Sequence, residues 1–147
     1  MPGNCRAIAL VLILAAVMLL PGCARPPPEQ QLRDALTTLQ ASLEARDVSA
    51  IESTLARDFV GQDGLDRDGA RRLAQWAFLR HRDIGVTVGP PGIDVRDQHA
   101  RVRFTAALTG GGGGPLPDAA SVYDVDTAWR IEGGQWRLIS AQWIPRL

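Results

Sequence analysis

The sequence of 147 residues contains no lysine, only two cysteines and only two histidines. Without lysine, the chain can form no Schiff base and has no lysine for a phosphate-binding P-loop. Neither His81 nor His99 has a second histidine at a ligand-like spacing, so we expect no zinc or iron site and no cofactor. Sixteen basic residues balance sixteen acidic ones, whereas nucleic-acid-binding domains normally carry a basic excess. We therefore expect no nucleic-acid partner.

The longest apolar run lies at the start of the chain, from Ala7 to Leu20. Arg6 precedes this run, and small residues and Cys23 follow it. This order is typical of a secretory signal peptide, with a basic region, an apolar region and a cleavage site. The run is shorter than the roughly 20 residues that span a bilayer, which argues against a transmembrane anchor.

The sequence LPGC at residues 20–23 resembles the lipobox of bacterial lipoproteins. In that family the cysteine receives a diacylglyceryl group and the peptide is cut before it, here between Gly22 and Cys23. The resemblance implies a signal peptide over residues 1–22 and a membrane anchor on Cys23. Ala24 is similar to the pattern of outer-membrane lipoproteins, which implies a periplasm-facing position in the bacterial cell envelope. The alternatives are a soluble secreted protein and a retained membrane anchor.

Cleavage before Cys23 would remove Cys5, and the lipid would block the Cys23 thiol. The mature chain would then have no disulfide and no catalytic thiol. Residues 23–28 are expected to form a proline-rich tether that lifts the domain off the membrane as an extended spacer. Residues 29–147 are expected to form one domain, which is long enough to bury a core.

Three helices are predicted in the first part of this domain. Residues 29–46 carry leucines at helical spacing, a second helix is short, and a third ends near Arg80. A short strand at residues 59–60 and a glycine-containing loop separate the second helix from the third. Polar side chains at the helix starts give the expected caps: Asp47, or a capping box of Ser49 with Glu52, for the second helix, and Asp66 or Asp68 for the third.

After His81 the apolar period changes to two, which is typical of β-strands. The expected strands cover residues 84–88, 93–95, 102–108, 120–132 and 135–144. The Gly133-Gly134 pair predicts a two-residue hairpin turn between the last two strands. A glycine run at residues 110–114 is expected to be a flexible loop. Helices followed by an antiparallel meander predict an α+β domain.

Two motifs resemble those of NTF2-like domains, also called SnoaL-like domains: LEARD at residues 43–47 leading to LARDFV at 55–60, and WRIEGGQWRL at 129–138. The resemblance covers roughly residues 29–147. It implies a cone, in which a curved antiparallel sheet wraps the long first helix and leaves a pocket at its open end. Because the family includes isomerases, dehydratases, cyclases and non-catalytic modules, the resemblance implies a fold and no single activity.

The two-glycine turn predicts that Glu132 pairs with Gln135, and extending this register pairs Thr127 with Ser140. One face of the hairpin is then apolar with a few polar groups, as a small-molecule pocket requires. We expect these pocket residues, with the first contributed by the third helix: Trp76, Tyr123, Thr127, Trp129, Ser140 and Gln142. The alternative is a filled cone, in which the hydroxyl groups make only local hydrogen bonds.

The same register puts Ile139 and Trp143 on the opposite face, among alternating arginines and aspartates. An outward tryptophan beside isoleucine is unusual for a monomer, and tryptophan and arginine often anchor interfaces. We therefore expect this face to contact a second copy or an envelope protein. The alternative is that the C-terminal tail covers it.

Two functions remain as hypotheses. The first is a non-enzymatic module, tethered by lipid, that binds a small apolar ligand or an envelope protein. The second is a small-molecule isomerase or lyase, which needs a base beside an acidic donor such as the phenol of Tyr123. Only the loop residues Asp58 and Asp63 could supply a carboxylate base, and His81 and His99 are expected to be structural or exposed. We therefore predict no catalytic residue.

Overall fold

The computed structural model describes residues 24–112 and 119–146. The predicted signal peptide, Gly22, Cys23 and residues 113–114 of the glycine run therefore lie outside the described residues. Gly110 and Gly111 belong to a strand and not to the expected loop, because their backbones pair with the strand that begins at Asp83. The helices are α2 (Pro28–Glu44), α3 (Val48–Thr54) and α4 (Arg67–Arg80), with a short 3₁₀ helix η1 (Gln62–Gly64). The strands are β1 (Leu55–Val60), β2 (Asp83–Val88), β3 (Gly92–Arg96), β4 (His99–Gly111), β5 (Ala119–Glu132) and β6 (Gln135–Pro145).

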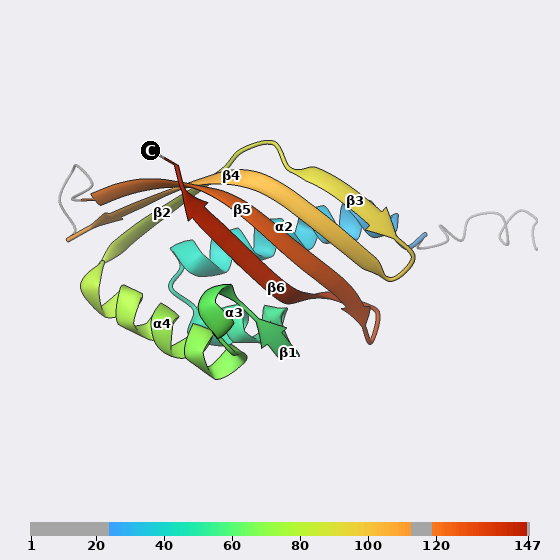
Figure 1. Ribbon diagram of the computed structural model, residues 1–147, viewed down its shortest axis with the longest axis horizontal. Coiled ribbons are helices and arrows are strands. Elements are labelled where there is room, and N and C mark those ends of the chain that lie inside the picture. Colours follow the sequence, from blue (N-terminus) through green and yellow to red (C-terminus); the bar gives the residue numbers. More distant parts are fainter. Residues whose placement is uncertain (1–23, 113–118, 147) are drawn as a thin grey trace, which may run out of the picture.

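The three helices pack on one side of a curved six-stranded sheet (Figure 1). This confirms the predicted α+β class. No helix within the two described ranges has the length and apolar character needed to cross a bilayer.

Aspartate side chains cap the N-termini of two helices, as predicted. The Asp47 carboxylate accepts a hydrogen bond from the Ala50 backbone N–H at 3.0 Å and so begins α3. The Asp66 carboxylate accepts one from the Gly69 N–H at 2.7 Å and begins α4. Each bond satisfies a backbone donor that has no partner inside the helix. The cap of α3 is therefore Asp47 and not the Ser49–Glu52 capping box, and the cap of α4 is Asp66 and not Asp68.

Helix α2 begins at Pro28, one residue before the boundary predicted between the tether and the domain. Proline suits this first helical position because its fixed φ matches the helix and its missing N–H would have had no partner. The proline run therefore starts a helix, and only residues 24–27 of the described chain precede it.

The sheet is mixed and not purely antiparallel, which corrects the prediction. Its order is β1-β6-β5-β4-β2, with β3 also paired to β4. Strand β1 follows α3 without a loop and pairs in parallel with the edge of β6 that β5 leaves free. Only this short strand departs from the antiparallel pattern, because every other pairing is antiparallel.

Strands β2 and β3 do not form the predicted meander. They lie end to end along the same edge of β4, where β2 pairs with residues 106–111 and β3 with residues 99–103. The intervening glycine–proline segment is a bend and not a hairpin turn, and the Gly89 N–H donates to the Thr105 carbonyl at 2.8 Å. The two strands thereby act as one interrupted edge of the sheet.

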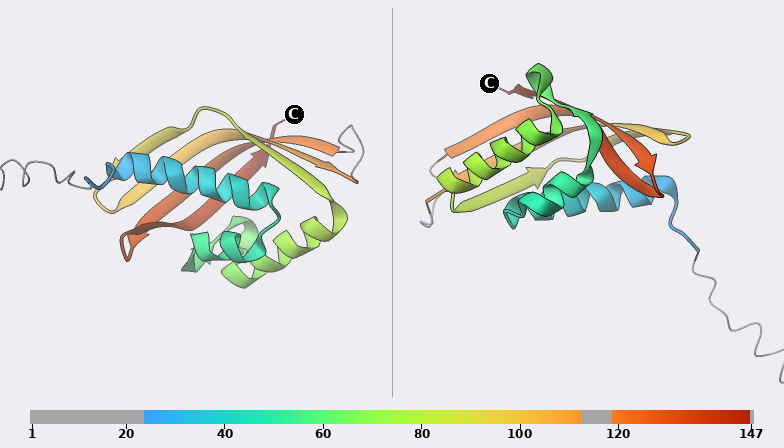
Figure 2. Two further views of the ribbon diagram at one scale, coloured as in Figure 1. Left: turned by 180° about the vertical axis from the view of Figure 1, so that it is seen from behind. Right: turned by 90° about the horizontal axis from the view of Figure 1, so that it is seen from below.

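Helix α2 covers the free edge of β2 with two polar side chains. The Gln40 side-chain amide donates to the Val86 carbonyl at 2.7 Å, and the Val86 N–H donates to the Glu44 carboxylate at 3.1 Å. An edge strand otherwise presents unpaired backbone groups. These bonds fix α2 against the concave side of the sheet, as the view from behind shows (Figure 2).

The core fills one end of the cone, where the first half of α2 crosses β4, β5 and β6. Leu32, Val102 and Trp129 are each 0% exposed, and Trp136 and Leu138 are buried beside them. The Trp136 indole N–H donates to the Pro28 carbonyl at 2.9 Å, which ties the start of α2 to β6. This end of the cone is therefore solidly packed.

Two tryptophans give a matched test of this core. Trp129→Ala should lower the free energy of unfolding by about 3–5 kcal/mol, because it leaves a large cavity in a packed region. Trp76→Ala removes an exposed side chain and should change it by no more than about 0.5 kcal/mol. Urea denaturation measures both, and similar losses in the two variants would contradict this account of the core.

Candidate functional site

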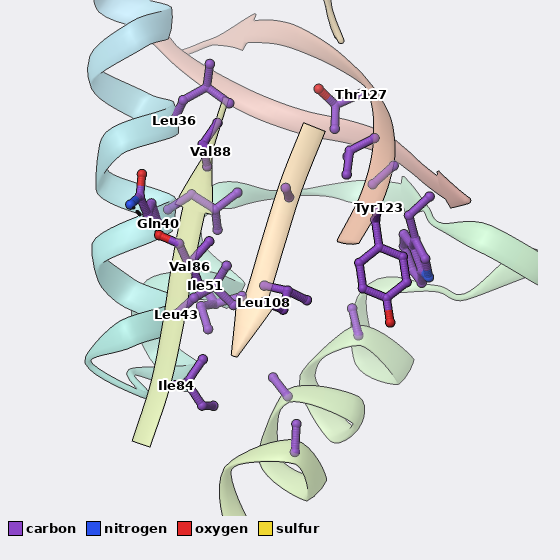
Figure 3. A pocket seen from close by; sticks show the side chains of 18 of the residues that line it. Leu36, Gln40, Leu43, Ile51, Ile84, Val86, Val88, Leu108, Tyr123 and Thr127 are labelled. Atoms are coloured by element: carbon purple, nitrogen blue, oxygen red, sulfur yellow. Dashed lines mark hydrogen bonds between the residues drawn. The ribbon is translucent and has the colours of Figure 1, made fainter. Parts of the chain in front are cut away.

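The described part of the chain encloses a cavity of about 840 Å³ between α2, α4 and the sheet (Figure 3). This volume is within the range of small-molecule sites in proteins. Its walls are mainly aliphatic, with Leu36 and Leu43 from α2, Ile51 from α3, and Val86 and Leu108 from the sheet. The cone therefore contains a cavity and is not completely filled by side chains.

Small side chains on two facing walls leave this space. On α4, the residues that line the cavity include Ala70, Ala74 and Ala77, at the i, i+4 and i+7 positions of one helix face. On the sheet, alanines at positions 106 and 141 also line it. Because protein interiors are normally close-packed, alanines at these positions leave open part of the volume that larger side chains would fill.

Tyr123 on β5 lines the cavity, and its ring lies across the cavity from β2 (Figure 3). Within residues 24–112 and 119–146, no hydrogen bond joins the Tyr123 hydroxyl to another residue. This hydroxyl is thus available to a ligand that enters the cavity.

His81 also lines the cavity, a role that the sequence did not predict. It follows α4 directly and lies against the end of β4, since a Cβ at Gly110 would lie 2.7 Å from its Nδ1. A signal was present in the sequence. His81 continues the stripe of Ala70, Ala74 and Ala77 by four more residues, which puts it in line with the cavity face of α4.

Thr127 lines the cavity as predicted, but its hydroxyl is already used inside the protein. It donates to the Val102 carbonyl at 3.1 Å and accepts from the Trp129 indole N–H at 2.9 Å. Trp129 itself belongs to the packed core and does not line the cavity. The Thr127 hydroxyl therefore makes only local hydrogen bonds, as the filled-cone alternative expected. The prediction that Trp129 lines the pocket is wrong, because this residue is part of the packed core.

Ser140 and Gln142 were predicted to face the pocket, and this is wrong. The expected register holds from Glu132–Gln135 to Trp129–Leu138 and then shifts by one residue. After the shift, Thr127 pairs with Ala141 and no longer with Ser140. A β-bulge of this kind places one extra residue in a strand and exchanges the two faces beyond it. Ser140 and Gln142 consequently do not line the cavity.

The same bulge changes the position predicted for Trp143. Trp143 pairs with Val125 and lines the cavity instead of facing outward. Ile139 is the extra residue of the bulge, and its side chain is half-buried. The spacing of the inward apolar residues on β6 indicates this bulge. Trp136 and Leu138 are two residues apart, as in a regular strand, whereas Leu138 and Ala141 are three residues apart. A register without the bulge would turn Trp143 outward, whereas the bulge turns it toward the cavity.

Trp76 was also expected to line the pocket but does not. It is 55% exposed, and the Arg80 guanidinium carbon lies 4.7 Å from the centroid of its ring. Successive helix residues are about 100° apart, so a residue next to Ala77 points away from the cavity face of α4. Trp76 is therefore a surface residue with a cation–π contact.

Solved structures share this arrangement at low sequence identity. A protein of Bdellovibrio bacteriovorus, Bd1075, is 13% identical with a TM-score of 0.72, over 80% of this chain and 41% of that one. A candidate dehydratase of the NTF2-like family from Streptomyces avermitilis is 17% identical with a TM-score of 0.71, over 80% of this chain and 95% of that one. An NTF2-like protein from Cytophaga hutchinsonii is 15% identical with a TM-score of 0.65, over 82% of this chain and 100% of that one.

The fold is NTF2-like. The fold implied by the LEARD and WRIEGG motifs is thereby confirmed. At these identities the similarity establishes the fold and not an activity, and this chain spans less than half of the Bdellovibrio protein. No family model matches the sequence, and no curated protein matches it.

Ion pairs cover the outer face of the NTF2-like sheet. Arg101 donates to the Asp126 carboxylate at 2.8 Å, with Arg103 nearby, and these hydrogen bonds and charges lower the pKa of Asp126. Asp58 on β1 accepts hydrogen bonds from Arg130, which lower the pKa of its carboxyl group. Exposed pairs of this kind contribute little to stability.

The acidic residues considered as a catalytic base do not reach the cavity. Asp58 is engaged by Arg130 on the outer face, and Asp63 is exposed in η1 with a φ of 56°. None of the described residues that line the cavity is an aspartate or a glutamate. In the described ranges there is also no group of three or more potential metal-ligating His, Cys, Asp or Glu side chains.

The role of Thr127 can be separated from ligand binding. Thr127→Val removes the acceptor of the buried Trp129 N–H and should lower the free energy of unfolding by about 1–3 kcal/mol, the usual cost of an unsatisfied buried group. The rim variant Ser121→Ala is the control and should leave stability nearly unchanged. Urea denaturation compares the two, and an unchanged stability of Thr127→Val would show that this hydrogen bond is dispensable.

Proposed function

We propose that this protein is a membrane-anchored bacterial lipoprotein whose NTF2-like domain binds a small apolar ligand in its cone. The single observation that supports ligand binding is the cavity of about 840 Å³, whose walls are mainly aliphatic. Burying apolar surface contributes about 25 cal/mol for each Å² removed from water, so such walls favour an apolar molecule over a charged one. The hydroxyl of Tyr123, which has no hydrogen-bond partner among the described residues, can orient a ligand that carries one polar group.

The anchoring part of this proposal is supported by the lipobox-like sequence at residues 20–23, after an apolar run too short to span a bilayer. A single acyl chain gives only marginal membrane binding, whereas two or more chains on one cysteine hold a protein stably. We accordingly place the domain at the periplasmic side of the envelope, with Cys23 as the attachment point and the outer membrane as its destination.

A small-molecule lyase or isomerase is the second candidate. The observation that favours it is that His81 and Tyr123, two side chains able to transfer protons, both line the same cavity. It ranks second because the described lining residues include no carboxylate to act as a strong base or to orient the imidazole. A contact of the outer sheet face with a second copy or an envelope protein is also proposed, but without Trp143 as its anchor, since this residue lines the cavity.

A cavity-filling variant tests ligand binding. Ala74→Leu adds three carbons on the cavity face of α4, and Gln75→Leu adds a leucine on its exposed face as the matched control. We expect N-phenyl-1-naphthylamine to bind wild type and the Gln75 variant equally, and the Ala74 variant about tenfold more weakly, which corresponds to about 1.4 kcal/mol. Fluorescence titration measures this. Equal affinity in all three proteins would contradict binding in the cavity.

Mass spectrometry of protein purified from bacterial membranes tests the anchor. The expected chain begins at Cys23 and carries the mass of a diacylglyceryl group and an N-terminal acyl group. Cys23→Ala should abolish both the modification and the processing, because the thiol is the acceptor. A chain that retains Met1, or one that begins at Cys23 with a free thiol, would overturn the lipoprotein assignment.

A further inference from the structure

The residues just before α2 are held against the turn between β5 and β6. The Arg25 guanidinium donates to the Gly134 carbonyl at 2.6 Å, and the Gln31 side-chain amide donates to the Pro26 carbonyl at 2.6 Å. The Trp136 indole donates to the Pro28 carbonyl. Gly134 has a φ of 78°, and a Cβ there would lie 2.6 Å from the Arg25 guanidinium. The Arg25 side chain thus lies directly against the backbone of the turn.

The anchor therefore leaves the domain at one defined place. Cys23 is two residues before Arg25, and two extended residues span at most about 7 Å. The headgroup layer on one side of a bilayer is of similar thickness, about 5–7 Å. A lipid on Cys23 would consequently bring the Arg25–Gly134 contact to the level of the headgroups and leave little freedom to tumble.

The cavity lies away from this place. Helix α2 has 17 residues, about 25 Å, and runs from the anchored end of the domain along the cavity. Gly110 near the end of β4 and Ala119 at the start of β5 line the cavity. These strand ends lie at the opposite end of the sheet from the start of α2 (Figures 1 and 2). Leu73 and Leu108 line it and are also exposed, so it opens beside α4 and the last part of β4.

We propose that the contact between residues 25–28 and the β5–β6 turn is an orienting device for the membrane-bound protein. The turns at residues 97–98 and 133–134 form the surface that faces the lipid headgroups, and the opening of the cavity faces the aqueous space. This inference rests on the lipid anchor of the proposed function. It assigns the source of the ligand: an apolar molecule arrives from the aqueous side, in solution or on a soluble carrier, and not directly from the leaflet that holds the anchor.

Fluorescent labelling of the acylated protein tests this orientation. The mature chain has no thiol except the blocked Cys23, so one introduced cysteine can be labelled selectively. The two sites are Gln98→Cys, in the turn between β3 and β4, and Leu79→Cys, which replaces an 85% exposed residue of α4. In phosphatidylethanolamine–phosphatidylglycerol vesicles that contain headgroup spin labels, we expect severalfold stronger quenching at residue 98 than at residue 79.

A longer tether provides the control. Ten glycine and serine residues inserted between Ala24 and Arg25 add up to about 35 Å of reach. They should reduce the quenching at residue 98 while mass spectrometry still shows an acylated Cys23. Equal quenching at the two sites, or stronger quenching at residue 79, in an acylated protein would overturn the orientation alone. An unmodified Cys23 would overturn both the orientation and the lipoprotein assignment.

Discussion

The buried indole of Trp129 divides the cone into a filled half and a hollow half. Its ring packs with Leu32 and Val102, and its N–H is satisfied by Thr127, so no polar group is left unpaired at the boundary. Beyond Thr127 the sheet and α4 no longer meet in close packing, and alanines at positions 74, 77 and 106 are among the residues that line the space between them. Stability thus comes from one end of the domain, and the other end is free to leave space.

Most elements of the fold could be predicted from local pattern. Leucine spacing indicated α2, short aspartates indicated the starts of α3 and α4, and two glycines fixed the turn between β5 and β6. These features depend on neighbouring residues, so the sequence contains them directly. The parallel pairing of β1 with β6 and the shared edge of β2 and β3 depend on distant partners, and no local pattern carried that information.

The site was harder to predict because its residues depend on one irregularity. A single bulge after Leu138 exchanges Ser140 and Gln142 for Ala141 and Trp143 at the cavity wall. Register arguments are reliable close to a turn and fail after the first extra residue, since the side-chain period of a strand is two. Tyr123 and Thr127 line the cavity as predicted, because the alternation of side chains along β5 continues without a break. The prediction for Trp76 is wrong, because the cavity face of α4 is the one that carries Ala74 and Ala77.

The cover that α2 gives to β2 has a consequence for encounters between copies of this domain. Both backbone groups of Val86 are engaged, by Gln40 and Glu44, so a strand from a neighbouring molecule would have to displace two hydrogen bonds to pair there. Open strand edges are places where two molecules can pair and aggregate, and the risk rises with the concentration of the protein. The same two side chains that position the helix therefore help to keep crowded copies apart.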